Sequence, residues 1–379
     1  MIENLLLGGL LAFCITFYAI PKVIKIANFK KLFDVPDDRK VHKNPIPSLG
    51  GVGIFAGFAI SLLFFGHIDT TTYLQYYLLA FIVVFFFGIK DDVMGLTPQK
   101  KFFGQLLVAG ILTLKSDLLL TNMHGFLGIH SLNGMISYIL TFFTIVVIMN
   151  AYNLIDGIDG LAATISIITA SVFAWFFYMN NEPVFALMGF TFAGSVLAFL
   201  IFNYAPAKIF MGDTGSMLCG AVNAILVIHF IETANSSKVF NVTSSPALGF
   251  GILIMPLLDT LRVFGIRILN GRSPFFPDRN HLHHILLDRG LSHKVITFII
   301  GLSAVMFIVL TYIALPMGTT AVILSQIVLF FSGVFFLQIT ARKRKNKLRV
   351  VGEEITIGRK IKHVVTLITS GDTTTVERK

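Results

Sequence analysis

The chain has 379 residues, of which 55% are hydrophobic and only 13% are charged, and its mean hydropathy is +0.80. Soluble globular domains carry about 25% charged residues. This composition therefore excludes a water-soluble fold and predicts an all-α protein that crosses the membrane many times.

Apolar blocks predict about eleven transmembrane helices, because a helix needs about 20 apolar residues to cross a bilayer. Their expected bounds are 3–21, 49–66, 74–89, 102–116, 134–151, 161–179, 185–203, 215–233, 247–268, 295–315 and 320–340. The stretch 117–133 fits either a re-entrant or a surface segment. The first block contains Glu3 and no cleavage site follows it, so we expect a retained helix rather than a signal peptide. Cys14 and Cys219 lie in apolar blocks, without metal-site or disulfide spacing.

The basic residues predict the orientation of the chain. With the N-terminus outside, the inward segments contain 27 of the 30 Lys and Arg residues; these segments are 22–48, 90–101, 204–214, 266–294 and 341–379. Basic residues gather on the cytoplasmic side of membrane proteins, so the C-terminus is predicted to be cytoplasmic. The net charge of +10 then belongs to a membrane surface, and a nucleic-acid partner is not expected. We expect a transmembrane catalytic domain over 1–340 and a basic cytoplasmic tail over 341–379, whose run 342–345 would contact anionic lipids.

Four polar motifs fall on the predicted cytoplasmic side. They are Lys90-Asp91-Asp92, Asn-Leu-Ile-Asp-Gly-Ile-Asp-Gly at 153–160, Phe-Met-Gly-Asp-Thr-Gly-Ser at 210–216, and Asp-Arg-Asn-His-Leu-His-His at 278–284. Acidic side chains at membrane depth are costly and usually functional. The motifs therefore predict an active site on the cytoplasmic face.

The acidic groups favour a hard metal ion. Asp156 and Asp159 are three residues apart and would share a helical face with Asn153. The oxygen-rich set is completed by Asp91, Asp92 and Asp213. Such ligands favour Mg²⁺ or Mn²⁺ over zinc.

Each motif also has a simpler structural explanation. A double Asp at a helix end is usually a solvated cap, and the 153–160 run could form a turn with local hydrogen bonds. Asp213 or Thr214 could cap a helix, and the same helix start could bind a phosphate. Taken together, in a chain with only 20 acidic residues, the motifs favour function.

The histidine loop favours phosphate over zinc, because adjacent His283 and His284 suit one metal poorly and no Cys partner is present. With Arg279, the imidazoles of His281, His283 and His284 could donate to phosphate oxygens. Arg39 and His42, in an upstream basic loop, have the same predicted role, although an ordinary positive-inside loop explains them equally well. The combined site would suit a nucleoside diphosphate and a phosphorylated lipid.

The order and form of these motifs resemble the polyprenyl-phosphate N-acetylhexosamine-1-phosphate transferases, over roughly residues 1–340. The His-Leu-His-His form is similar to the branch that makes lipid-linked GlcNAc for teichoic acid, O-antigen or enterobacterial common antigen. The phospho-MurNAc-pentapeptide transferase branch ranks second. The resemblance implies a multi-pass enzyme of the bacterial inner membrane that moves N-acetylglucosamine 1-phosphate from a UDP-sugar to undecaprenyl phosphate and releases UMP.

The resemblance also implies roles for residues. The metal ligands for Mg²⁺ would be Asn153 and Asp213. The catalytic acids would be Asp91, Asp92, Asp156 and Asp159. The groups that bind substrate would be Lys101, His281, His283 and His284, to which the chemistry of the basic loops adds Arg279, Arg39 and His42. Asp91 or Asp92 could act as a base or orient the lipid phosphate with Lys90 or Lys101, and both readings stay open, because a phosphate monoester with a second pKa of about 6 is already ionised.

An ion-coupled transporter is the alternative from another class. It would place acids near the bilayer midplane and show an internal repeat, whereas these acids lie at helix ends. The transferred N-acetylhexosamine and the oligomeric state, a homodimer included, stay open.

Overall fold

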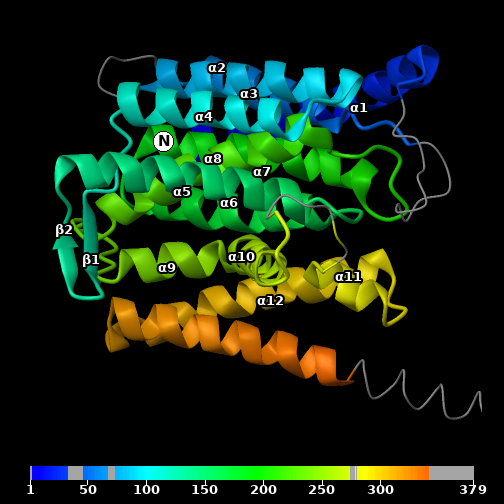
Figure 1. The fold of residues 1–379 in the computed structure, drawn as a ribbon. Coiled ribbons are helices and arrows are strands. Elements are labelled where there is room, and N and C mark those ends of the chain that lie inside the picture. The colour runs from blue at the N-terminus through cyan, green and yellow to red at the C-terminus, as the bar shows by residue number, and fades with distance from the viewer. Residues whose placement is uncertain (1, 33–45, 67–72, 274–277, 279, 341–379) are drawn as a thin grey trace, which may run out of the picture. The chain divides into compact units, whose positions relative to one another are not determined.

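The computed structural model describes residues 2–32, 46–66, 73–273, 278 and 280–340. These residues are mostly helical, with one small hairpin, as Figure 1 shows. The elements are α1 (Ile2–Lys30), α2 (Gly50–Phe65), α3 (Leu74–Met94), α4 (Pro98–Lys115), β1 (Asn122–Phe126), β2 (Ile129–Ser131), α5 (Gly134–Ile155), α6 (Leu161–Met179), α7 (Pro183–Asn203), α8 (Gly212–Thr233), α9 (Ser245–Ile252), α10 (Ile254–Leu269), α11 (Leu282–Leu287), α12 (His293–Ala314) and η1 (Leu315–Met317). A last helix covers Thr319–Thr340.

Seven of the described helices are long and apolar enough to cross a membrane. They are α1, α5, α6, α7, α8, α12 with η1, and Thr319–Thr340. The prediction of an all-α polytopic membrane protein is therefore confirmed. The other predicted spans correspond to α2, α3, α4 and the α9–α10 segment; of these, α2 is apolar but has only 16 residues.

α8 forms the centre of the bundle. Of its most apolar window, 89% is buried inside the protein, against 22% for α1. α8 packs against α2, α3, α5 and α6, and glycines allow the close approach. A side chain at Gly88 of α3 would collide with Thr214, and one at Gly220 of α8 would meet Met149 of α5. The first contact holds the start of α8 against the end of α3, and the second holds α8 against α5.

The ambiguous stretch 117–133 contains an antiparallel hairpin. β1 pairs with β2, Asn122 opposite Ser131, and the turn uses Gly125 and Gly128 with φ of +80° and +77°, a region that favours glycine. Glu232, near the end of α8, accepts the backbone N–H of Thr121 at 2.8 Å. The hairpin therefore lies at the end of α8 opposite to Asp213.

The prediction of one helix over 247–268 is wrong. The helix breaks at Leu253 into α9 and α10, and in Figure 1 α9 runs across the view whereas α10 is seen end-on. Pro256 has no backbone N–H, so it cannot donate to the carbonyl of Ile252 and the helical ladder is interrupted.

The first helix is longer than predicted. α1 has 29 residues and continues through Pro21 to Lys30, whereas the sequence pattern placed its end at residue 21. A bilayer needs only about 20 residues. The last turns of α1, with their lysines, therefore extend past the apolar part of the helix.

The chain divides into two compact units, Met1–Val328 and Leu329–Lys379. In the second unit, residues 329–340 are helical. The predicted basic tail over 341–379 lies outside the described residues, so the domain boundary at residue 340 stays a prediction.

Candidate active site

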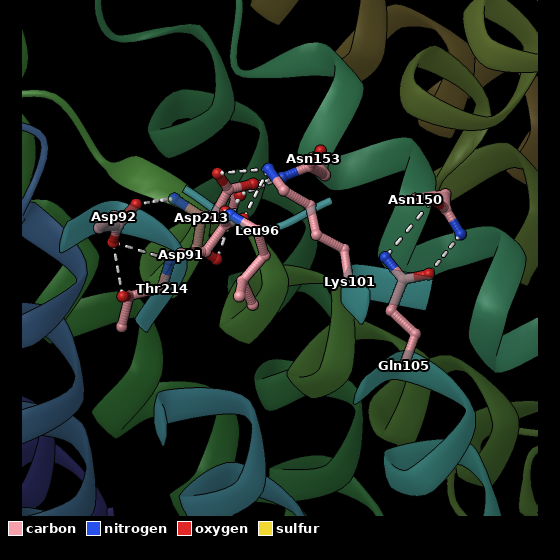
Figure 2. A network of polar contacts seen from close by, with 10 residues as sticks. Asp91, Asp92, Leu96, Lys101, Gln105, Asn150, Asn153, Asp213 and Thr214 are labelled. Atoms are coloured by element: carbon pink, nitrogen blue, oxygen red, sulfur yellow. Dashed lines mark hydrogen bonds and ion pairs between the residues drawn. The ribbon is translucent and has the colours of Figure 1, made fainter. Parts of the chain in front are cut away.

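Four helix ends meet at one group of polar side chains, which Figure 2 shows pointing toward one another. The last turn of α3 carries Asp91 and Asp92, and the start of α4 carries Lys101. The last turn of α5 carries Asn153, and the first turn of α8 carries Asp213. The structure thus brings together five residues that the sequence motifs singled out, and we call this group the acidic cluster.

Lys101 lies between two carboxylates of the acidic cluster. Its Nζ is 2.5 Å from Oδ2 of Asp91 and 3.0 Å from Oδ2 of Asp213. The Asp91 side chain is 3% exposed, whereas that of Asp213 is 25% exposed. Asp91 also accepts the backbone N–H of Leu96 at 2.6 Å. The ammonium group therefore offsets the repulsion of two nearby acids, and Asp213 is the more accessible of the two.

Asp92 has a different set of partners. Its Oδ1 accepts the N–H of Asp213 at 2.7 Å, and its Oδ2 accepts the N–H of Thr214 at 3.1 Å and the Thr214 hydroxyl at 2.6 Å. The first N–H groups of a helix lack partners within it, so Asp92 of α3 caps α8. Gly212, with φ +71°, permits this approach because a Cβ there would lie 2.7 Å from the Asp92 carboxylate.

This cap corrects two expectations. Neither Asp213 nor Thr214 caps α8 through its side chain, because the cap comes from another helix. The start of α8 is also not open to a phosphate, since Asp92 already accepts its first N–H groups.

Asn153 and Asp213 are in direct contact. Nδ2 of Asn153 donates to Oδ1 of Asp213 at 2.5 Å and to the hydroxyl of Ser216 at 2.9 Å. Among the described residues, no group of three or more His, Cys, Asp or Glu side chains could hold a metal ion. Mg²⁺, however, is often held by one or two protein groups, with waters and substrate phosphates as its other ligands. One carboxylate beside one amide, whose oxygen and nitrogen can exchange places, fits that mode.

A pair of amides lies deeper between α4 and α5 (Figure 2). Asn150 donates to Gln105 Oε1 at 2.8 Å, and Gln105 Nε2 lies 3.4 Å from Asn150 Oδ1. Gln105 is one helical turn from Lys101, and Asn150 is one turn from Asn153. The pair therefore fixes the register of the two helices that carry Lys101 and Asn153. Sequence reasoning missed it, although two amides in apolar segments were a visible signal.

The contacts of Asp159 lie with residues outside the acidic cluster. Its side chain is 3% exposed, and Oδ2 accepts the N–H of Ala207 at 3.1 Å and lies 3.3 Å from Nδ1 of His293. Its backbone carbonyl accepts the hydroxyl of Thr297 at 3.0 Å. These contacts fix the loop between α5 and α6 to α12. The proposed catalytic role of Asp159 stays a prediction.

Asp156, between Asn153 and Asp159, connects this loop to the acidic cluster electrostatically. Burial within the protein, together with the nearby carboxylates of Asp213, Asp92 and Asp159, raises the pKa of Asp156 to about 8. A negative charge at Asp156 is thus disfavoured until a cation is near. This behaviour suits a group that faces a metal ion or a positively charged substrate partner.

His281 is held by a buried acid. Its Nδ1 lies 2.9 Å from Oδ2 of Asp259, and the N–H of Leu282 donates to Oδ1 of the same carboxylate at 2.9 Å. Arg262 donates to Asp259 at 2.8 Å and to the carbonyl of Asn280. Because all three side chains at this contact are nearly fully buried, they fix the orientation of the His281 ring. Asp259 and Arg262 were missed, although charges three residues apart in an apolar segment signal a function.

His283 connects the histidine loop to the loop between α5 and α6 (residues 156–160), which we call the acidic loop. Its ring lies against Gly157, where a side chain would collide with Nε2. His283 is buried, and burial, together with the neighbouring His284, lowers its pKa to about 3. The ring is therefore neutral near pH 7. His284 is half-buried beside it, with ring centroids 4.4 Å apart.

An ion pair closes the base of the histidine loop. Nε and Nη2 of Arg267 donate to the two oxygens of Asp278 at 2.9 and 3.0 Å. Burial opposes ionisation of Asp278, but the hydrogen bonds from Arg267 and Asn280 outweigh it and lower its pKa to about 2. The loop is thus fixed at both ends, by Asp278 and by His281. Three predicted substrate-binding residues, Arg39, His42 and Arg279, lie outside the described residues.

Comparisons with known proteins point to one family. The model described as Glycosyl transferase family 4 matches residues 74–231, which include the whole acidic cluster. The chain is 33% identical over 348 residues to a Bacillus subtilis (strain 168) protein named probable undecaprenyl-phosphate N-acetylglucosaminyl 1-phosphate transferase, covering 90% of this chain and 93% of the relative. It is 34% identical to a Mycobacterium leprae (strain TN) decaprenyl-phosphate N-acetylglucosaminephosphotransferase, covering 79% and 81%. It is 29% identical to a Yersinia pestis undecaprenyl-phosphate alpha-N-acetylglucosaminyl 1-phosphate transferase, covering 76% and 77%.

Proposed function

This chain belongs to glycosyl transferase family 4, and from that premise we propose that it transfers N-acetylglucosamine 1-phosphate from UDP-N-acetylglucosamine to undecaprenyl phosphate. UMP is released, and the lipid-linked sugar phosphate starts a cell-surface glycan. The observation that carries the proposal is the acidic cluster, in which Lys101, Asn153 and Asp213 meet from three helices. We place this site on the cytoplasmic face, as the distribution of basic residues predicts.

The reaction joins two phosphates. An oxygen of the lipid phosphate attacks the sugar-bearing phosphorus of the donor, a new P–O bond forms, and the bond to UMP breaks. The attacking monoester is largely dianionic at neutral pH, since its second pKa is about 6. Catalysis then depends mainly on holding the groups in line and on stabilising negative charge.

Asn153 and Asp213 would hold Mg²⁺, and Mn²⁺ could replace it. Bound there, the ion would neutralise charge on the diphosphate and make UMP a better leaving group.

Among the described cations, Lys101 is the one that contacts the acidic cluster, and we propose that it binds phosphate of the donor. In the structure it pairs with Asp91 and Asp213, and a phosphate oxygen could take the place of Asp213 while Asp91 keeps the ammonium oriented. Asp91 is then a positioning residue, and so is Asp92, which holds the start of α8 and hence Asp213. Of the histidines in the loop, His284 is the least buried and is the proposed contact to the substrate.

The test uses the full chain in proteoliposomes with radiolabelled UDP-N-acetylglucosamine and undecaprenyl phosphate. We expect label in the lipid fraction and release of one UMP per lipid product, both dependent on Mg²⁺. Comparing the rate of UMP release with UDP-N-acetylgalactosamine or UDP-MurNAc-pentapeptide as the donor identifies which sugar is transferred. Label that crosses the membrane without forming lipid product would contradict the proposal and support a transporter.

A further inference from the structure

A small cavity lies between α3 and α4, beside the acidic cluster. Its volume is about 220 Å³, and it is lined by Phe87, Lys90, Leu96, Gln99, Lys100 and Phe103. The contacts that build the acidic cluster and the histidine loop use none of these six side chains; they use only the backbone N–H of Leu96. The cavity therefore needs an explanation of its own.

The polar part of the cavity is positive. Two of its lining residues are lysines and none is acidic. Gln99 and Lys100 belong to the first turn of α4, an 18-residue helix whose N-cap residue, Thr97, makes no side-chain capping hydrogen bond. The positive end of a helix dipole adds to the charge of nearby cations and favours an anion. α8 differs, because Asp92 already occupies its start.

The other part of the cavity is apolar and open to the side. The rings of Phe87 and Phe103 have centroids 6.5 Å apart, and Gly104 allows the Phe87 ring to lie on α4, where a Cβ would be 2.8 Å from that ring. Phe103 is 56% exposed. In a protein that crosses a membrane, an exposed ring next to two lysines matches the boundary between acyl chains and headgroups.

Size limits the ligand. Sites for small molecules measure about 300–1,000 Å³, so this cavity is too small for a nucleotide sugar. We propose that it binds the phosphate headgroup of a membrane lipid. Lys90 and Lys100 pair with the phosphate oxygens, and the first carbons of the lipid chain lie against Phe87 and Phe103.

The cavity shares a wall with the acidic cluster. Leu96 lines it, and the backbone N–H of Leu96 donates to Asp91 at 2.6 Å. Lys90 and Lys100 directly precede Asp91 and Lys101 in the sequence. A phosphate held here lies on the other side of Leu96 from the acidic cluster. This last step rests on the proposed function: the lipid is then the acceptor, held beside the site of transfer.

The test measures lipid binding by the purified full chain with native mass spectrometry. The probes are phosphatidic acid, which has a phosphate monoester headgroup, phosphatidylcholine, which is zwitterionic, and inorganic phosphate. The double variant carries Lys90→Gln and Lys100→Gln. The control variant is Lys25→Gln, which replaces an exposed lysine of α1. Each basic residue near an anionic membrane surface strengthens binding about five-fold, so the loss of two lysines should weaken binding about thirty-fold.

We expect saturable binding of phosphatidic acid that is about thirty-fold weaker in the double variant and unchanged in the control, and weaker binding of phosphatidylcholine. Phe103→Ala should weaken the binding of phosphatidic acid but leave the binding of inorganic phosphate unchanged. Equal binding by the double variant, or inorganic phosphate competing at the same concentration as the lipid, would overturn the proposal.

The transfer assay separates this proposal from the proposed function. In the double variant, the KM for undecaprenyl phosphate should rise about thirty-fold while the KM for UDP-N-acetylglucosamine stays constant. An unchanged KM for the lipid overturns the assignment of the cavity to the acceptor. If the unmodified chain binds phosphatidic acid as expected but releases no UMP, the proposed function fails and the lipid site stands.

Discussion

Replacing Asp213 by Ala and Asp91 by Asn should affect transfer very differently, although both acids contact the same lysine. Asp213→Ala removes the acceptor for Lys101 at 3.0 Å and for Asn153 at 2.5 Å. Hydrogen bonds to a charged group contribute about 1.5–3 kcal/mol each, so about 3–6 kcal/mol of positioning would be lost. Since 1.4 kcal/mol corresponds to a factor of ten, kcat/KM should fall by about 10²–10⁴, and the loss of a proposed metal ligand should lower it further.

Asp91→Asn should lower kcat/KM less than Asp213→Ala does. Leu96 donates to Oδ1 of Asp91 and Lys101 contacts Oδ2, so the single oxygen of the amide can keep only one of these two contacts. Losing one contact to a charged group costs about 1.5–3 kcal/mol, so kcat/KM should fall by about 10–150-fold, less than in Asp213→Ala. If Asp91 were instead an obligatory base, its amide would abolish transfer.

The assay follows UMP release by both variants in proteoliposomes at saturating Mg²⁺. Asp117→Asn provides the control, because Asp117 is an exposed acid outside the acidic cluster. Variants are compared at equal amounts of protein that elutes as a single species. A larger loss in Asp91→Asn than in Asp213→Ala would refute the assignment of Asp91 as a positioning residue.

Three further predictions concern the metal, the amide pair and Asp156. EDTA should stop UMP release and added Mg²⁺ or Mn²⁺ should restore it; transfer that persists in EDTA would exclude a metal at Asn153 and Asp213. Gln105→Leu or Asn150→Leu alone should lower stability by about 1–3 kcal/mol, because the partner amide loses its hydrogen bond, and the double variant should be close to the original chain. Thermal unfolding checks this, and additive losses would contradict it. The raised pKa of Asp156, about 8, means that the folded protein binds its proton more tightly, so stability falls as pH rises from about 4 to about 8. In EDTA, Asp156→Asn should therefore raise the melting temperature more at pH 8 than at pH 5. Equal increases at the two pH values would contradict a raised pKa of Asp156 in the folded protein.

The sequence predicted the membrane class and the members of the acidic cluster. Apolar length identifies helices that cross a bilayer, and acids in such helices are unusual enough to stand out. Asp91, Lys101 and Asp213 come from three helices, yet each lies at a helix end on the side that the basic residues mark. One-dimensional patterns sufficed because helix ends on one side of a membrane lie at the same depth.

The partners within the site could not be predicted in this way. Nothing in the pattern shows that Asp92 caps α8 while its neighbour Asp91 binds Lys101, because adjacent residues on a helix point in different directions. The contact depends on Gly88 and Gly212, and the sequence alone does not show which helices those glycines bring together. Tertiary packing therefore decides which acid is structural and which can reach a substrate.

The break between α9 and α10 explains why the histidine loop lies beside these acids. In an unbroken helix over 247–268, Asp259 would continue along the axis of α9. Because Pro256 interrupts the ladder, α10 takes its own direction, seen end-on in Figure 1, and its Asp259 holds His281 at 2.9 Å. His283 then packs on Gly157 in the acidic loop. The position of the histidines thus depends on a broken helix, whereas the position of the acidic cluster depends on intact helix ends. A substitution at Pro256 should therefore disturb the histidine loop while leaving the contact between Lys101 and Asp213 in place.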